Sequence, residues 1–499
     1  MKTVRAARRR GFLAIDQGGH ASRALVFDES GRPVAKGLHD VREHRIRPGW
    51  VEQDPEELVS SIRVAVDDAV SSLGGDGFEL TAGMATQRSS IVCWDRETGE
   101  ALSPVLSWQD RRAHAFLAEI EDHAETIHRK TGLRLTAHYG ASKLRWCLRQ
   151  LGPVREAQAS GRLNCGPLAS FLAFRLLDER PTKIDPANAA RTLLLNLHDL
   201  AWDTELLDLF GVPREVLPHC VPTRHEYGHL TIGSAAVPLG VLNGDQSAAL
   251  FAHGMPDEST AYLNLGTGAF VQRVVDEDPG SAPGLLTGVV LQDGADVTWV
   301  LEGTVNGAGS ALARVGCQLG VSDVDKNLSG WLEEAVDPPL FLNGISGLGS
   351  PWWIPDFDSR FVGEGEPWQK MTAVAESIVF LLCVNLECLQ RVGSRFERVR
   401  VTGGLAWNDA LCQRLADLTG LAVERPAEHE ATARGTAFLV AGRPESWPEP
   451  VEGRRFEPRQ APGLDARFDR WKQALEDAIG DQGKRGGIGN GGTRGEDGA

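Results

Sequence analysis

Two segments far apart in the chain share one pattern of apolar and polar positions. Residues 12–28 read FLAIDQGGHASRALVFD, and residues 262–276 read YLNLGTGAFVQRVVD. Each predicts an apolar strand, a tight turn that contains glycine, and a second apolar strand that ends at an aspartate. Glycines in such turns let the backbone approach a ligand closely. The echo indicates two related domains that each offer one loop to a shared cleft, with chance similarity as the alternative.

Strands and a helix interleave after the first of these hairpins. A third strand is predicted over residues 34–39, and further strands over residues 80–85 and 91–94. Between them a helix is predicted to begin after Asp54, an N-cap residue type that a proline follows. Apolar residues continue this helix at helical spacing, at Leu58, Ile62, Val66, Ala69 and Leu73. The interleaving predicts an α/β layer fold.

The second half repeats this alternation. A long apolar helix is predicted over residues 371–389, and a strand over residues 396–402 leads into two glycines. Asn408 is predicted to cap the next helix, which ends at Gly420. Residues 442–463, rich in proline and glutamate, predict a linker, and a short amphipathic helix follows. These patterns divide the chain into five segments: a basic tip (1–10), an N-terminal domain (11–253), a C-terminal domain (254–441), the linker and helix (442–480) and a disordered tail (481–499).

Composition and charge narrow the class of protein. A chain of 499 residues is too long for one ordinary core, so two domains and a tail are expected. The net charge of −16 disfavours a general nucleic-acid binder, because neutralising phosphates needs a basic face. It does not exclude a nucleotide, which one local loop can hold.

Targeting and membrane signals are weak. The first ten residues are basic, which is typical of a solvated terminus, with a targeting arm as the alternative. The apolar run after Gly11 is too short for a signal peptide, because Asp16 ends it. Charged residues flank the richest apolar run, residues 378–384, so no membrane span is predicted. Eight scattered cysteines without a CxxC pair predict buried thiols in a reducing compartment and a cytoplasmic enzyme.

Three local patterns could carry phosphoryl transfer, which needs a metal anchor, phosphate-binding donors and a base. Asp16 ends a buried strand at a glycine turn, where it could hold a magnesium–phosphate complex or satisfy its own turn. The Gly266-Thr267-Gly268 string could bind phosphate or be an ordinary hairpin turn. Asp245 stands between a strand and a helix, as a base for a substrate hydroxyl or as an N-cap. No GxxxxGK[ST] string occurs, so a P-loop enzyme is disfavoured.

Eight short strings then form a pattern that none of them makes alone. In order they are LAIDQG (13–18), RPGWVEQDP (47–55), TQR (86–88), WQDRR (108–112), Asp185 with Asn188, Arg191 and Thr192, GDQ (244–246), LGTG (265–268), and Gly403-Gly404 with Asn408. Together they resemble the glycerol-kinase branch of the FGGY carbohydrate kinases, over roughly residues 11–441. The resemblance implies two RNase H-like domains of the actin/hexokinase type that flank a central cleft, the N-terminal one on the substrate side and the C-terminal one on the nucleotide side. It also implies ATP and Mg²⁺ as cofactors and a small polyol or sugar as substrate. A homo-oligomer stays open.

The resemblance also implies roles for individual residues. Asp245 would be the general base, and Asp16 and Asp245 would hold the metal. The ATP site would use Gly18, Gly19, Ser22, Arg23, Gly266, Thr267, Gly309, Gly404 and Asn408. The substrate site would use Arg88, Ser89, Trp108, His138, Asp245, Gln246 and Phe270.

The departures from the family pattern concentrate in this site. Ser89 stands where glycerol kinases have a glutamate that binds substrate hydroxyls, and His138 replaces a tyrosine. In the first hairpin Gly19 and His20 replace two threonines, and Ala313 replaces a glutamine near the nucleotide. We interpret Ser89 as room for a larger polyol, a ketose or a substrate of different charge, with drift in an inactive protein as the alternative. His138 would donate to the substrate or be a core histidine.

Three hypotheses follow. The first is an ATP-dependent kinase of a small polyol or sugar, with glycerol as the first candidate substrate. The second is a nucleotide-binding regulator of the same fold with little kinase activity, because the hairpin turn is altered. The third is an actin-like or Hsp70-like ATPase, which the strings 50–54 and 108–112 disfavour.

Overall fold

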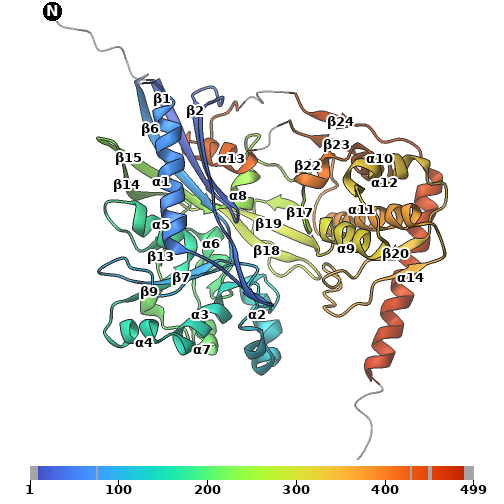
Figure 1. Cartoon of the computed structure of the whole chain (residues 1–499), viewed down its shortest axis with the longest axis horizontal. Coiled ribbons are helices and arrows are strands. Elements are labelled where there is room, and N and C mark those ends of the chain that lie inside the picture. Colours follow the sequence, from blue (N-terminus) through green and yellow to red (C-terminus); the bar gives the residue numbers. More distant parts are fainter. Residues whose placement is uncertain (1–8, 75–76, 428–429, 448–451, 488–499) are drawn as a thin grey trace, which may run out of the picture.

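The computed structural model describes residues 9–74, 77–427, 430–447 and 452–487. Most of the predicted basic tip and residues 488–499 of the predicted tail lie outside this range. Two lobes stand side by side, each built on one large sheet (Figure 1). We call them the N-terminal lobe, around the six-stranded sheet, and the C-terminal lobe, around the seven-stranded sheet.

The N-terminal lobe is built on a sheet whose three central strands are parallel. Its strands, in spatial order, are β14 (Arg224–Ile232), β15 (Ala235–Gly244), β6 (Phe78–Thr86), β1 (Arg9–Gln17), β2 (Ala21–Asp28) and β3 (Pro33–Asp40). β15, β6 and β1 run in the same direction, and β1 and β2 form the predicted antiparallel hairpin. Helix α1 (Pro55–Ser71) packs on β2 and β3, and Asp54 caps it as predicted. The carboxyl ends of the parallel strands therefore meet at one edge of the sheet.

A second sheet of the N-terminal lobe carries the segments that surround this edge. Its strands are β4 (His44–Arg47), β5 (Trp50–Gln53), β8 (Val105–Leu106), β7 (Ile91–Asp95) and β9 (Leu163–Pro167). The helical segments of this region are η1 (His114–His123), α2 (Ala124–Thr131), α3 (Gly140–Gln150), α4 (Gly152–Ala159), α5 (Leu168–Leu176), α6 (Pro186–Ala190), α7 (Thr204–Phe210) and η2 (Arg214–Val216). The remaining short strands are β10 (Lys183–Ile184), β11 (Leu195–Asn196), β12 (Ala201–Trp202) and β13 (His219–Cys220).

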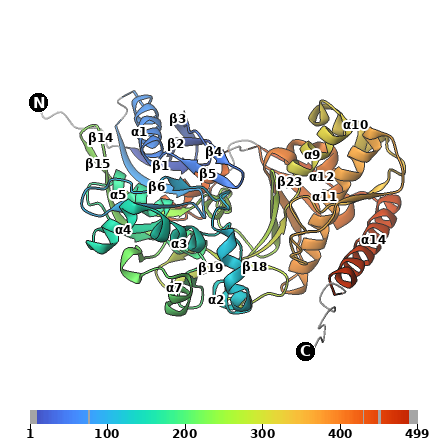
Figure 2. The ribbon, with the colours of Figure 1, turned by 60° about the horizontal axis from the view of Figure 1, so that its bottom comes forward.

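The C-terminal lobe repeats the hairpin and the parallel pairing. Its sheet comprises β18 (Leu286–Asp293), β19 (Asp296–Val305), β17 (Ala269–Val275), β16 (Thr260–Leu265), β22 (Arg398–Thr402), β23 (Ala422–Arg425) and β24 (Arg454–Phe456). Its other elements are α9 (Gly309–Leu319), α10 (Val324–Glu334), β20 (Leu340–Leu342), β21 (Arg360–Val362), α11 (Pro367–Arg391), η3 (Gly404–Trp407), α12 (Asp409–Thr419) and α14 (Pro462–Gly487). β16 and β17 form the second predicted hairpin, and β22 runs parallel to β16. β18 and β19 run between the two lobes (Figure 2).

Helix α11 forms the core of the C-terminal lobe. It is long and apolar enough to cross a membrane, but 89% of its most apolar stretch is buried inside the protein. Its apolar side chains pack with those of α9, α12 and α14. Length and hydropathy of this helix are therefore those of a buried core element.

Two helices join the lobes. α8 (Asp245–Ala249) follows β15, and α13 (Ala431–Val440) packs on α8, β1 and β6 (Figure 1). The prediction placed α13 in the C-terminal domain, whereas the helix lies on the sheet of the N-terminal lobe. A Cβ at Gly435 would lie 1.8 Å from the Ala248 carbonyl oxygen, so the two helices touch backbone to backbone.

The tail departs from the prediction. Helix α14 extends to Gly487, beyond the predicted end of the helix at residue 480. Gln482 donates to the Asp356 carbonyl oxygen at 2.6 Å, which fastens the extra turn to the lobe. The predicted linker contains strand β24, which pairs with β23 and extends the sheet. Both contacts are tertiary, so local composition could not signal them.

Candidate active site

The parallel strands of the N-terminal lobe bring three charged residues to one edge. Asp16 is the penultimate residue of β1, Arg88 follows β6, and Asp245 follows β15 directly. β6 pairs with both neighbours at the same level, because Ala85 lies opposite Asp16 on one side and Asn243 on the other. The Arg88 Nε atom lies 3.8 Å from the Asp245 Oδ1 atom. The predicted catalytic and metal-binding carboxylates are thus neighbours.

Asp16 is buried at the base of the first hairpin. Burial, followed by the negative charge of Asp245, raises the pKa of Asp16 to about 7. Arg23, directly opposite on β2, opposes this shift, with its Nη1 atom 3.6 Å from the carboxylate. The turn closes through a backbone bond from Gly18 to Ala21, so Asp16 does not serve it as a turn aspartate. A buried carboxylate that resists ionisation beside a second one suits a site that takes up a divalent cation.

Asp245 begins α8 without capping it. Gly244 is the N-cap residue, and Asp245 Oδ1 accepts a bond from the Gln246 backbone N–H at 2.7 Å. The Asp245 side chain retains 28% of its exposure, in contrast to the enclosed Arg88 side chain. Burial raises the pKa of Asp245, and Arg88 opposes the shift. The carboxylate is therefore oriented by Arg88 and Gln246 and reaches the cleft.

The first hairpin presents its predicted residues unequally. A Cβ at Gly19 would meet no atom within 4 Å, so the turn is open where the family carries threonine. Gln53, at the end of β5, donates through Nε2 to the Gly19 carbonyl oxygen and so holds the turn. The Ser22 hydroxyl is buried against α1 and bonds to the Ser61 hydroxyl at 2.8 Å. The structure therefore does not bring the Ser22 side chain to the site, whereas Gly18, Gly19 and Arg23 lie at the turn.

The second hairpin packs against the start of α9. The Thr267 carbonyl oxygen accepts bonds from Ala308 N–H at 3.1 Å and from Ser310 N–H at 3.0 Å. A Cβ at Gly309 would lie 2.9 Å from the Gly266 carbonyl oxygen, so only glycine allows this close contact. The predicted Gly266, Thr267 and Gly309 are thereby brought together. The first N–H groups of α9 bond to the carbonyl oxygens of this turn, so the start of the helix holds the turn in place.

The end of β22 lies beside this turn. Gly403 has a φ of 91°, and a Cβ there would lie 2.6 Å from the Leu265 carbonyl oxygen. Gly404 has open space around its Cα atom. Asn408 caps α12 by accepting a bond from Leu411 N–H at 3.0 Å. The cap leaves the side-chain Nδ2 group of Asn408 without a role in the helix start.

The predicted substrate residues cluster on the N-terminal lobe. The ring of His138 lies 5.6 Å from that of Trp108 and 5.0 Å from that of Tyr139, edge-on in both pairs. Burial, followed by the charge of Arg111, holds the pKa of His138 well below its ordinary value. His138 is therefore a neutral imidazole, which can donate one hydrogen bond and accept another. Arg88 donates to the Gln246 Oε1 atom, which places Gln246 beside Asp245.

Ser89 does not open the space that the sequence suggested. Its backbone has a φ of 63°, in the left-handed region, and its side chain is buried. The hydroxyl oxygen has no exposed surface and no hydrogen-bond partner. The volume that a glutamate side chain would fill is thus closed in this structure.

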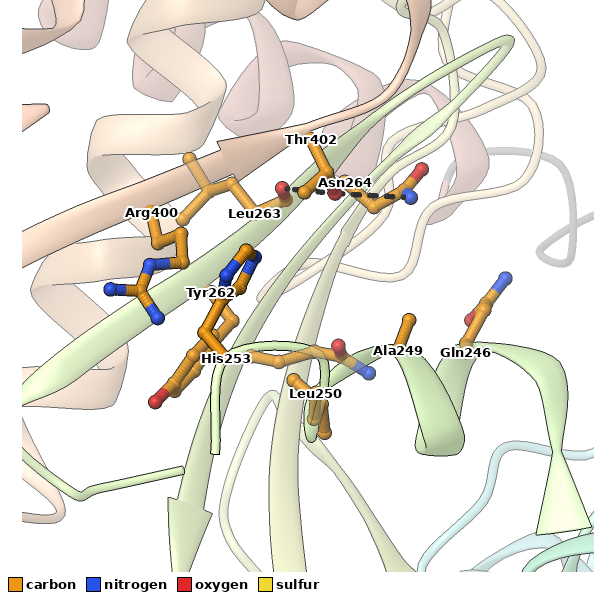
Figure 3. Close-up of a pocket in the computed structure, with 10 residues that line it drawn as sticks. Gln246, Ala249, Leu250, His253, Tyr262, Leu263, Asn264, Arg400 and Thr402 are labelled. Atoms are coloured by element: carbon orange, nitrogen blue, oxygen red, sulfur yellow. Dashed lines mark hydrogen bonds between the residues drawn. The ribbon is translucent and has the colours of Figure 1, made fainter. Parts of the chain in front are cut away.

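A narrow pocket lies between the lobes. It is lined by α8, by the segment that follows α8, and by side chains of β16, β17 and β22 (Figure 3). Gln246 lies at one end of the pocket and Arg400 at the other, and Asn264 donates to the Thr402 hydroxyl between them. Phe270 lies on β17, opposite Asn264. Of the predicted substrate residues only Gln246 lines this pocket, which extends from there to β22.

Sequence reasoning missed the partners of two residues. Arg191 forms a buried two-bond ion pair with Glu302 on β19, at 3.3 and 3.2 Å. Glu430, before α13, lies 3.4 Å from the Arg23 Nε atom and also pairs with Lys36. Arg191 stood in one of the quoted strings, but nothing near Glu302 or Glu430 in the sequence indicates their partners.

The two lobes, each with a glycine hairpin at the shared cleft and with ionisable residues between them, define the class of two-lobed α/β phosphotransferases. The model of the FGGY carbohydrate kinase N-terminal domain matches residues 12–252, and that of the C-terminal domain matches residues 261–442. The chain belongs to the FGGY family of carbohydrate kinases. It is an ATP-dependent kinase, and the predicted fold class is confirmed.

Individual relatives cover nearly the whole chain. A glycerol kinase of Leptothrix cholodnii is 35% identical over 444 residues, which are 86% of this chain and 89% of the relative. A glycerol kinase of Symbiobacterium thermophilum is 34% identical over 94% of this chain and 98% of its own length. Among solved structures, Plasmodium falciparum glycerol kinase with ADP superposes with a TM-score of 0.86 at 23% identity, covering 95% of this chain and 99% of its own. Xylulose kinase from Rhodospirillum rubrum gives 0.83 at 19% identity, with coverage of 95% and 99%.

Proposed function

We propose that the protein transfers the γ-phosphoryl group of ATP to a hydroxyl group of glycerol. The observation that carries the proposal is the constellation of Asp245, Arg88 and Gln246 beside Asp16, in a chain that matches glycerol kinases over most of its length. A larger polyol or a ketose stays the second candidate, since His138 departs from the family pattern.

The chemistry follows from the positions of the carboxylates. Asp245 accepts the proton of the attacking hydroxyl group as that oxygen forms a bond to the γ-phosphorus and the bond to the β-phosphate oxygen breaks. Raising the pKa of Asp245 makes the carboxylate a stronger base than an exposed aspartate. Asp16 and Asp245 would hold Mg²⁺ together with phosphate oxygens and water, and the ion would neutralise charge on the phosphates.

The hairpins supply the remaining contacts. The turn around Gly18 and Gly19, the turn at Gly266 and Thr267, and the guanidinium of Arg23 would bind the phosphates. Gly404 and Asn408 would lie at the adenine. Trp108 and Phe270 would pack on the carbon atoms of the acceptor, while Arg88 and His138 bond its hydroxyl oxygens.

Free thiols support a reducing location for this reaction. All eight cysteines are free, and five of them are buried. We propose that the enzyme works in the cytoplasm, where thiols stay reduced.

An ADP-release assay tests the proposal. Magnesium-ATP is supplied with glycerol, erythritol, further tetritols and pentitols, and several ketoses. We expect glycerol to give a kcat/KM of about 10⁴ M⁻¹s⁻¹ or more, the lower end of typical enzymes. A higher value for another acceptor would move the assignment to that compound. ATP binding without stimulation by any of these alcohols would overturn the proposal and favour a nucleotide-binding regulator.

A further inference from the structure

Lys143 is a fully buried lysine behind the substrate residues. It lies in the first turn of α3, and its side chain is entirely enclosed. The Nζ atom donates to three backbone carbonyl oxygens: Ser89 at 2.9 Å, Ser107 at 2.9 Å and His138 at 2.8 Å. An ammonium group has three N–H donors, and here each has one acceptor.

Among the described residues, no acidic side chain forms a hydrogen bond or ion pair with Lys143 Nζ. Asp110 is the main acidic influence on Lys143, but its carboxylate bonds to the Arg112 guanidinium and to the Val51 backbone N–H. Burial, followed by the charge of Arg111, lowers the pKa of Lys143 and so disfavours the charge. The three carbonyl oxygens around Nζ oppose this effect, because only the ammonium form has a donor for each of them. Enclosing an ammonium group is costly unless hydrogen bonds compensate, so the three carbonyl bonds are what make the charge tolerable.

The three carbonyls belong to three separate segments of the site. Ser89 follows Arg88 in the loop after β6, Ser107 precedes Trp108 in the loop after β8, and His138 lies before α3. The segments are up to about fifty residues apart in the chain. Each carries a side chain that we propose to contact the alcohol substrate. One cation therefore connects all three at their backbones.

We propose that Lys143 is a positioning residue that fixes the mutual spacing of Arg88, Trp108 and His138 without contacting the alcohol substrate. The effect on catalysis rests on the proposed function, whereas the effect on the three segments does not. Shifting a binding group by about 1 Å can reduce an enzyme's rate about 100-fold, so such a spacing has catalytic consequences. A residue that only adds stability would instead change the amount of folded enzyme and leave KM values unchanged.

Lys143→Met tests this, because methionine fills similar space without N–H donors. Arg145→Met is the matched control, since Arg145 lies on the same helix and donates to a carbonyl outside the site, that of Phe210. With glycerol as acceptor, we expect Lys143→Met to raise the KM for glycerol about tenfold or more, with the KM for ATP within about twofold of wild type. The control should change neither. Equal changes in both KM values, or an unchanged kcat/KM for glycerol, would overturn the proposal.

Hydrogen exchange tests the same claim without any activity. Residues 87–90, 107–109 and 137–140 should all exchange about tenfold faster in Lys143→Met than in wild type, and none should do so in Arg145→Met. Faster exchange confined to residues 137–140 would show that Lys143 does not hold all three segments, and would contradict the proposal. If wild type does not phosphorylate any acceptor, the proposed function fails while this measurement still decides the role of Lys143.

Wild-type protein gives a third measurement in case Lys143→Met does not fold. In native-state exchange with increasing urea, the three segments should open in one step with a common dependence on urea, because one cation connects them. Independent opening of the three segments would refute the proposal.

Discussion

Asp16 and Asp245 are two carboxylates in one fold with different environments. Asp16 is enclosed and its pKa rises to about 7, while Asp245 keeps contact with the cleft and with the Arg88 guanidinium. The first environment suits a group that awaits a cation, and the second suits a group that accepts a proton. The difference in role that we propose for them rests on burial and neighbours, since the residue type is the same.

Replacing Asp245 by asparagine isolates the proton transfer. Asn keeps the size of the side chain but cannot accept the proton, so kcat should fall about 10²–10⁴-fold. ATP affinity should stay within about threefold of wild type, because the hairpin contacts remain. Steady-state kinetics and calorimetric titration with ATP measure the two quantities. Turnover within about threefold of wild type would remove Asp245 from the mechanism.

Asp16 should make stability depend on pH. Because its pKa is higher in the folded protein, the folded state binds the proton more tightly, and stability is lost as pH rises from about 4 to about 7. The shift corresponds to on the order of 4 kcal/mol. Without Mg²⁺, Asp16→Asn should therefore unfold at a higher urea concentration than wild type at pH 8, but not at pH 4. The variant should also lose activity.

Asp185 also has a pKa raised to about 7 by burial, so it contributes to the pH dependence of both proteins. The quantity to measure is therefore the difference in the free energy of unfolding between wild type and Asp16→Asn. Urea titrations at pH 4, 6 and 8 give that difference directly. Identical pH dependence in the two proteins would show that Asp16 is not held in its protonated form.

At the scale of elements, the crossing of α8 and α13 connects the lobes. A Cβ at Gly435 would lie 1.8 Å from the Ala248 carbonyl oxygen and 3.2 Å from the Ala252 nitrogen. Backbone atoms cannot move aside as flexible side chains can, so alanine must push the helices apart. α8 carries Asp245 and Gln246 at its first two positions, and a displacement there moves the base.

Gly435→Ala should therefore reduce both stability and activity. We expect a loss of about 1–3 kcal/mol in the free energy of unfolding and at least a tenfold loss in kcat/KM. Gly480→Ala is the control, because Gly480 lies within α14 with open space around it and should gain up to about 1 kcal/mol. Urea denaturation and the ADP-release assay measure both variants. Wild-type kinetics in Gly435→Ala would mean that the helix contact does not position Asp245.

At the scale of the whole molecule, the sequence predicted what is local and repeated. Both hairpins, the caps at Asp54 and Asn408, and the core helix α11 are confirmed, because alternation and cap residues act over a few positions. The enclosed hydroxyl of Ser89 and the bond between Ser22 and Ser61 were not predictable. They depend on which elements pack together, as does the location of α13, and the sequence carries no local signal for that.

The Arg191–Glu302 pair is the clearest such contact between the regions that the two family models match. Burial disfavours the Glu302 carboxylate, but Arg191 and then Arg88 outweigh it and lower the pKa of Glu302. Gln272 also donates to Glu302 at 2.8 Å, so both carboxylate oxygens have partners. A buried pair of this kind fixes the relative position of the segments that carry its two residues. Removing one partner lowers the free energy of unfolding strongly, because the other charge is left buried and unpaired.

Glu302→Gln should cost about 3–5 kcal/mol in the free energy of unfolding, because it leaves the Arg191 charge buried without a counter-charge. Adding Arg191→Met should recover part of that loss, so the two changes should not be additive. Lys326→Met breaks an exposed pair with Asp323 and should cost less than about 1 kcal/mol. Urea denaturation of wild type, Glu302→Gln, Arg191→Met and the double variant gives the coupling energy. Additive losses would mean that Arg191 and Glu302 stabilise the protein independently, and that neither orients the lobes through the other.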